Sequence, residues 1–279
     1  MIWDNGIRPD FERPGFFDWV RFISRAVFFV VGTVVLISMF FIGKVLEYPF
    51  GHRFLTTPIV RAWGAMGLLA SGLRLEVTGT PMNHGGALVA NHASWLDIFV
   101  MHAAAKIFFV AKSEVRSWPG IGFLARVTGT MFIERRATEA KRQQMLLLAR
   151  MQRGHRLCFF PEGTSTDGRR VLDFKSTLFA AFHTPELIEH VWVQPATITY
   201  IAPKGREATF YGWWGDMSFG EHVFAVLALS RGGKVHVTLH EPVPAADFAN
   251  RKTMAAYATD IVRVQLAENI GVPVSEAGS

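Results

Sequence analysis

The sequence predicts an α/β fold: a largely parallel or mixed central sheet with helices on both faces, preceded by a membrane-anchoring helical hairpin. Two observations predict it. The first 73 residues contain two apolar stretches separated by a turn. Beyond them, short apolar runs alternate with longer helix-like segments, which is typical of parallel sheets with helical crossovers. We therefore expect a hairpin over residues 1–73 and one further domain over residues 74–279.

The first apolar stretch, residues 26–43, is uncharged and rich in Phe, Val, Leu and Ile. As a helix it would extend about 27 Å, close to the roughly 30 Å hydrocarbon core of a bilayer. Acidic residues precede it and no small-residue cleavage site follows it, which argues against a signal peptide. A helix buried in a protein core is the competing interpretation.

The second apolar stretch, residues 62–73, follows the turn-forming sequence YPFG at residues 48–51. It is too short to cross a bilayer but suits an interfacial or re-entrant helix. Together the two stretches predict a hairpin that inserts into one leaflet or spans shallowly. The basic residues on its two sides favour neither orientation.

Strands and helices are expected in alternation along the rest of the chain. The expected strands are residues 75–77, 88–89, 107–110, 131–133, 156–160, 192–199 and 234–240. The expected helices are residues 98–105, a short helix that ends at Arg126, residues 137–153 and an amphipathic closing helix over residues 251–268. In such a fold, functional residues should collect at the carboxyl ends of the strands.

Charge and cysteine content narrow the function. The net charge is +6, and residues 101–153 alone carry ten Lys and Arg against three Asp and Glu. None of the common nucleic-acid motifs is present, so we expect an anionic membrane surface or a small anionic substrate as partner, not nucleic acid. The single cysteine, Cys158, lies in an apolar run and excludes an internal disulfide. We expect it to be a buried structural thiol.

The most informative segment, residues 91–97, has the sequence NHASWLD and directly follows the apolar run 87–90. His92 can accept and return a proton near neutral pH, and Asp97 can orient its ring and stabilise the cation. On one continuous helix the two side chains would point roughly 140° apart, so the pairing requires a strand-turn-helix element. Alternatively, Ser94 and Asp97 form a helix capping box.

Three further segments follow in order: GTMFIER at residues 129–135, FPEGT at 160–164 and VQPA at 193–196. Behind a His-x4-Asp pair, they resemble the 1-acylglycerol-3-phosphate acyltransferase family of glycerolipid acyltransferases over roughly residues 75–240. Ala196 departs from the family, which usually has a bulkier aliphatic residue there. Flanking residues 112–119, 173–179 and 214–217 resemble a bacterial branch that includes lyso-ornithine-lipid acyltransferases.

The resemblance implies transfer of an acyl group from a thioester of acyl-carrier protein or coenzyme A to a free hydroxyl of a lysolipid. His92 would remove the hydroxyl proton, and Asp97 would stabilise the imidazolium. By similarity, Arg135 binds the phosphate or other anionic head group of the acceptor, and Lys112 shares that anion.

The same resemblance implies that Glu162, Gly163 and Thr164 form the acceptor-binding loop, in which Glu162 accepts a hydrogen bond from the acceptor. It also implies a bacterial inner-membrane enzyme with its catalytic domain on the cytosolic face. No cofactor is expected beyond the thioester co-substrate, and no metal. His236 and His240 would share one face of a strand, but the sequence offers no further ligands, so we expect structural roles.

Several functions remain open from the sequence. The leading one is a lysolipid O-acyltransferase that acts on 1-acylglycerol-3-phosphate, and the alternative acceptor is a lyso-ornithine or related aminolipid. A lipid esterase is a more distant alternative that requires an activated serine, for which Ser94 is nearest to His92. A non-catalytic membrane scaffold is the third.

Overall fold

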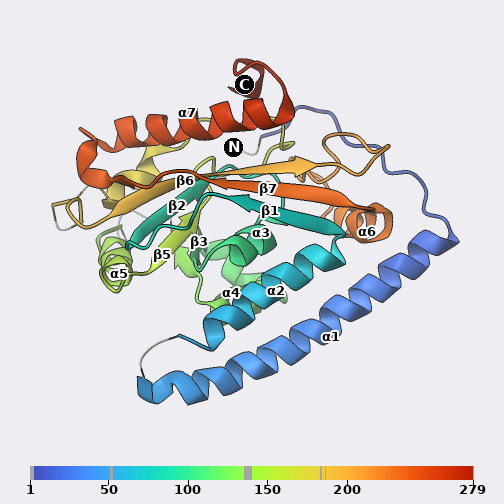
Figure 1. The fold of residues 1–279 in the computed structure, drawn as a ribbon, viewed down its shortest axis with the longest axis horizontal. Coiled ribbons are helices and arrows are strands. Elements are labelled where there is room, and N and C mark those ends of the chain that lie inside the picture. The colour runs from blue at the N-terminus through green and yellow to red at the C-terminus, as the bar shows by residue number, and fades with distance from the viewer. Residues whose placement is uncertain (1–2, 51–52, 135–139, 183, 186, 279) are drawn as a thin grey trace.

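A computed structural model describes residues 3–50, 53–134, 140–182, 184–185 and 187–278 (Figure 1). Its strands are β1 (Leu73–Thr78), β2 (Gly86–Ala90), β3 (Phe108–Lys112), β4 (Met131–Ile133), β5 (Arg156–Phe159), β6 (Trp192–Ile201), β7 (Gly233–Leu239) and β8 (Val243–Pro244). Its α-helices are α1 (Phe16–Glu47), α2 (Thr56–Ala70), α3 (Asp97–Ala104), α4 (Ile121–Thr128), α5 (Ala140–Gln152), α6 (Phe219–Leu229) and α7 (Arg251–Ile270).

The described strands form one mixed sheet in the order β1-β7-β6-β2-β5-β3-β4, with β8 paired to β6. Strands β6, β2, β5, β3 and β4 run parallel to one another, whereas β7 and β8 run antiparallel to β6. Helix α7 covers one face of the sheet, and α2, α3 and α4 lie on the other (Figure 1). The predicted fold class is confirmed.

Strand β2 shows why the central strands are continuous apolar runs. Its side chains alternate between two clusters: Leu88 and Ala90 pack with residues of α3 and α6, while Ala87 and Val89 pack with residues of α5 and α7. A strand covered on both faces must be apolar throughout. Because β2 and β5 are parallel neighbours, the loops at their carboxyl ends emerge at the same edge of the sheet.

Each predicted strand and helix has a counterpart, with differences at the ends. Strand β1 begins at Leu73, one residue before the expected domain boundary. Residues 137–139 of the expected helix lie outside the described residues, and α5 follows them. Two elements were not predicted: α6, which is apolar on almost every side, and β8, which has two residues.

The predicted hairpin consists of α1 and α2, which pack against each other (Figure 1). The first helix extends well beyond residues 26–43 at both ends, and only 11% of its most apolar stretch is buried. A core helix would be mostly buried, so that interpretation is wrong for α1. The helix is long and apolar enough to cross a membrane, which suggests anchoring.

The second helix is tied to the domain because glycines line its contact with α3. Gly64 lies so close to α3 that an added Cβ would stand 2.7 Å from the backbone oxygen of Phe99 and 2.7 Å from the backbone nitrogen of Ala103. Trp63 packs against Phe99 of α3, and Leu68 is also buried, whereas Leu69 faces outward. One face of α2 therefore belongs to the core of the domain and the other is exposed.

Candidate active site

His92 and Asp97 meet at the carboxyl end of β2. The strand ends at Ala90, and Asp97 is the first residue of α3, so the chain reverses between the two side chains. Nδ1 of His92 lies 2.7 Å from Oδ2 of Asp97. Asp97 is fully buried, while the His92 side chain is 23% exposed. The strand-turn-helix element required by the sequence spacing is present.

The Asp97 carboxylate is held by four hydrogen-bond donors. Oδ2 accepts from His92 and from the backbone N–H groups of Ala93 and Ser94, at 2.8 and 3.0 Å. Oδ1 accepts a 2.6 Å hydrogen bond from the hydroxyl of Tyr200 on β6. A buried carboxylate with this many donors stays fixed and can hold the imidazole in one tautomer.

Only half of the expected capping box forms. Asp97 accepts from the backbone N–H of Ser94, but the Ser94 hydroxyl is buried without a hydrogen-bond partner among the described residues. The residue that caps α3 is Leu96, so Ser94 is not the N-cap. The two interpretations of Asp97 coexist: its carboxylate closes the turn and orients His92.

The imidazole of His92 presents one nitrogen outward. Its ring stacks on Phe160, with centroids 4.3 Å apart and an interplanar angle of 8°. Because Nδ1 faces Asp97, Nε2 is the nitrogen left for a substrate, and it hydrogen-bonds no residue that the structure describes. A neutral imidazole oriented in this way can accept a proton at Nε2.

The loop after β5 supports the backbone of His92. Oε1 of Glu162 accepts a 2.6 Å hydrogen bond from the N–H of His92, and the N–H of Thr166 donates to the His92 carbonyl at 2.9 Å. Oε2 of Glu162 accepts from the N–H of Leu172 at 2.8 Å. Both backbone polar groups of His92 are thus fixed by the neighbouring loop.

This geometry corrects the role expected for Glu162. Its side chain is 1% exposed and both carboxyl oxygens accept backbone hydrogen bonds, so it positions the backbone of His92 and does not face outward toward an acceptor. Burial raises the pKa of Glu162 to about 8.

The other predicted binding residues lie near the same edge of the sheet. Gly163 has φ of +73°, which only glycine adopts readily, and its N–H donates to the Phe160 carbonyl. Lys112, the last residue of β3, reaches the Gly163 carbonyl from Nζ at 3.4 Å. Thr164 is half-buried, and its hydroxyl oxygen accepts from the N–H of Trp3 at 3.3 Å. Arg135 lies outside the described residues, two positions beyond β4.

Two supporting residues were missed by the sequence analysis. The side chain of Asn91 is buried and pairs with the backbone of Ile198 through two hydrogen bonds of 2.8 and 2.9 Å, which fasten the turn that carries His92 to β6. Tyr200 lies on the same strand. The position of Asn91, a polar residue directly after a buried strand, could have indicated its role. No local pattern in the sequence indicates that it pairs with Ile198.

The remaining candidates behave as structural residues. Cys158 is fully buried and burial raises the pKa of its thiol, which disfavours a nucleophilic thiolate. His236 lies 3.1 Å from the Thr78 hydroxyl, and His240 lies 2.8 Å from that of Thr197. Among the residues the structure describes, no group of three or more His, Cys, Asp or Glu is arranged to hold a metal ion.

The mixed sheet, with an oriented histidine at the carboxyl end of its parallel strands, defines an α/β protein with a candidate general base. Residues 74–199 match the family model described as "Acyltransferase". The chain belongs to this acyltransferase family, and it is an acyltransferase, as the motifs predicted. A relative from Rhodobacter capsulatus, a lyso-ornithine lipid O-acyltransferase, is 49% identical over 79% of this chain and 80% of its own.

Other relatives agree on the family but differ in coverage. A lyso-ornithine lipid O-acyltransferase from Rhizobium meliloti is 33% identical over 91% of this chain and 88% of its own. A 1-acyl-sn-glycerol-3-phosphate acyltransferase from Neisseria gonorrhoeae is 37% identical, over 42% of this chain and 46% of its own. The fold matches the crystal structure of the 1-acyl-sn-glycerophosphate acyltransferase from Thermotoga maritima with a TM-score of 0.63, at 24% identity, over 91% of this chain and 98% of that one.

Proposed function

We propose that this protein is a lyso-ornithine lipid O-acyltransferase, which transfers a fatty acyl group to the free hydroxyl of a lysolipid. The observation that carries the proposal is the relative from Rhodobacter capsulatus, which is 49% identical over most of both chains. The glycerol-phosphate relative from Neisseria gonorrhoeae matches less than half of this chain. The relatives thus favour the aminolipid acceptor over 1-acylglycerol-3-phosphate, which the sequence motifs placed first.

In the proposed reaction, Nε2 of His92 takes the proton of the acceptor hydroxyl as its oxygen attacks the thioester carbonyl carbon. A carbon–oxygen bond forms, the carbon–sulfur bond breaks, and the departing thiolate receives the proton back from His92. Asp97 stabilises the imidazolium between these steps, as the 2.7 Å contact with Nδ1 supports. A general base of this kind contributes about 10²–10⁴ in rate.

The acceptor head group is assigned to the edge of the sheet beyond β3, β4 and β5. Lys112 and Gly163 are in contact there, and Thr164 follows them. Arg135 is proposed to bind the negatively charged group of the head, a carboxylate in an ornithine lipid, because a guanidinium pairs with such a group through two parallel hydrogen bonds.

An esterase mechanism receives no support from this site. Such an enzyme needs a serine hydroxyl hydrogen-bonded to the histidine. The Ser94 hydroxyl is fully buried and hydrogen-bonds no described residue, His92 included. Direct attack by the acceptor hydroxyl requires no serine.

Membrane attachment suits a lipid acceptor. We propose that α1 and α2 anchor the domain to the bacterial inner membrane, with the catalytic site on the cytosolic face and acyl-carrier protein or coenzyme A as the thioester donor. The exposed apolar surface of α1 and the contact of α2 with α3 support this arrangement, because they link the membrane anchor to the helix that begins with Asp97.

The proposal is tested with the full chain in a membrane fraction. Lyso-ornithine lipid and 1-acylglycerol-3-phosphate are each offered with acyl-carrier-protein and coenzyme A thioesters, and a fraction carrying His92→Ala serves as the background. We expect His92-dependent acylation of lyso-ornithine lipid to exceed that of the glycerol phosphate. A preference for the glycerol phosphate would overturn the acceptor assignment, and transfer to neither would overturn the reaction.

A further inference from the structure

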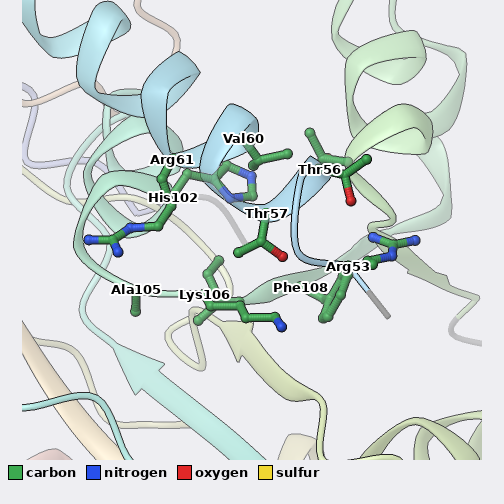
Figure 2. Close-up of a pocket in the computed structure, with 11 residues that line it drawn as sticks. Arg53, Thr56, Thr57, Val60, Arg61, His102, Ala105, Lys106 and Phe108 are labelled. Carbon is green, nitrogen blue, oxygen red and sulfur yellow. The ribbon is translucent and has the colours of Figure 1, made fainter. Parts of the chain in front are cut away.

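A pocket lies at the edge of the sheet opposite His92. It opens between the start of α2, the end of α3 and the start of β3, where Ile107 and Phe108 line it (Figure 2). The catalytic pair lies at the first residue of α3 and the pocket at its last turn, so about 12 Å of helix separates the two. Neither His92 nor the loop after β5 contributes to the pocket.

Three cationic side chains line this pocket: Arg53, Arg61 and Lys106 (Figure 2). None of the three has a carboxylate within ion-pair distance in the part of the chain that the structure describes. The nearest acid, Glu47, interacts with Arg53 electrostatically. Its oxygens already accept from the N–H groups of Leu55 and Thr56 and from the Thr56 hydroxyl.

More positive charge lies behind the pocket. The guanidinium groups of Arg53 and Arg150 lie 5.0 and 5.3 Å from the ring centroid of Phe108. Burial, together with this crowding of like charges, lowers the pKa of the neighbouring His155 to about 4. Like charges held this close are unfavourable unless an anion joins them.

A buried histidine adds a hydrogen-bonding group to the lining of the pocket. His102 lines the pocket and is 2% exposed, yet its ring nitrogens hydrogen-bond no residue that the structure describes (Figure 2). Its ring is fixed by edge contacts with Trp63 and Phe109 at 6.1 and 4.9 Å. Its ring nitrogens are not among the fully enclosed side-chain atoms that lack a partner, so the ring N–H is free to donate a hydrogen bond to a group bound in the pocket.

We propose that Arg53, Arg61, Lys106 and His102 form a second anion-binding site, separate from the catalytic pair, that takes a phosphate group. The cavity open to the centres of water-sized groups is about 20 Å³. That is room for about one water-sized oxygen, so a phosphate would place one oxygen inside and the rest at the mouth, and a nucleoside would not fit. The hydroxyl of Thr57 lines the same space as a further hydrogen-bond donor (Figure 2).

The location identifies the bilayer as one source of that phosphate. The pocket adjoins the connection between α1 and α2, where Tyr48, Phe50 and Phe54 are exposed. Aromatic and basic side chains at the end of an apolar helix are typical of the head-group layer. A phospholipid head group, a phosphate of coenzyme A and free phosphate share the required chemistry, and the test separates them.

The test uses the full chain in a phosphate-free detergent, with its histidines labelled with ¹⁵N. Inorganic phosphate, short-chain phosphatidylglycerol and coenzyme A are titrated in turn, and the His102 ring resonance is assigned by its loss in His102→Phe. We expect at least one probe to shift this resonance. In the double variant Arg53→Gln/Lys106→Gln, the dissociation constant of that probe should rise at least about tenfold, as expected for loss of charged hydrogen bonds.

Matched variants control for charge and for the acceptor site. Lys204→Gln/Lys252→Gln removes two surface charges elsewhere, and Lys112→Gln alters the opposite edge of the sheet; both should keep the His102 shift. A shift of the resonance with phosphatidylglycerol alone would identify the ligand as a lipid head group. A stronger shift with coenzyme A would identify it as a phosphate of the thioester donor. No shift with any probe, or a shift that persists in the double variant, would overturn the proposal.

Discussion

The hydroxyl of Tyr200 donates a 2.6 Å hydrogen bond to Oδ1 of Asp97 across 103 residues of sequence. Because Oδ2 of the same carboxylate faces Nδ1 of His92, Tyr200 fixes the group that orients His92, the proposed base. The hydroxyl is buried, and burial raises its pKa well above the ordinary value, so it remains a proton donor at any working pH.

Replacing Tyr200 with Phe should therefore slow acyl transfer without preventing folding. Losing one hydrogen bond to a charged group costs about 1.5–3 kcal/mol, so we expect kcat to fall about tenfold or more with little change in KM. Steady-state kinetics with lyso-ornithine lipid measure the effect.

Tyr211→Phe is the matched control, since it also removes a buried hydroxyl, one that contacts Ser230 instead of Asp97. Equal losses of kcat in the two variants would show that Tyr200 acts through packing alone.

The raised pKa of Glu162 leads us to expect that the stability of the folded protein changes with pH. The folded pKa of about 8 is above the ordinary 4.5, so the carboxyl binds a proton on folding between those values. The contribution of Glu162 to stability is complete below pH 4.5 and is lost as the pH rises through 8. We expect the unfolding midpoint in urea to fall from pH 5 to pH 8 more steeply in the wild type than in Glu162→Gln.

Asp173→Asn controls for the charge change, because Asp173 follows in the same loop but its side chain is 91% exposed. It should retain the wild-type slope. Identical slopes in the wild type and Glu162→Gln would refute this prediction.

The amide of Glu162→Gln also carries one acceptor oxygen where the carboxyl has two. It would leave the N–H of either His92 or Leu172 unpaired. We expect kcat to fall at least about tenfold, through a displaced His92. Activity unchanged in a folded variant would remove the positioning role.

Most of the fold could be predicted from the sequence because its strands are covered on both faces. The run at 87–90 could only be a buried segment, and the polar turn after it marked the catalytic edge. By contrast, α6 has no polar face and therefore no helical period to detect. The contact of Tyr200 with Asp97 and that of Asn91 with Ile198 depend on strand order, which local patterns do not encode.

Glu162 illustrates the limit for the site. The sequence indicated that this loop belongs with His92, and the two are in contact. The sequence did not indicate to which side the Glu162 side chain points. Its carboxyl group faces inward to backbone N–H groups, but an acidic residue in a polar turn could equally face outward.

Substitution of Ser94 distinguishes direct acyl transfer to a lipid hydroxyl from hydrolysis through an acyl-enzyme on that serine. Because its hydroxyl is buried without a partner, Ser94→Ala should leave acylation within about twofold of wild type and the stability equal or slightly higher. His92→Ala should lower the rate by about 10²–10⁴ while membrane binding and folding persist. His236→Ala is the matched control for histidine loss. Inactivity of a folded Ser94→Ala variant would favour the esterase.

A substitution at Gly64 tests whether the packing of α2 against α3 affects the active site. A methyl group at this position would meet the backbone of α3 at 2.7 Å, and backbone atoms cannot move aside as a side-chain end can. Overpacking of this kind costs about 1–3 kcal/mol, against roughly 1 kcal/mol that alanine gains over glycine in a helix. We expect Gly64→Ala to shift α3 and, because Asp97 begins that helix, to lower both the unfolding midpoint and kcat. Gly32→Ala is the control: its methyl group would meet only the flexible end of Met66, so the helix gain should dominate and activity should persist. If the two variants behaved alike, the contact between α2 and α3 would not position the catalytic turn.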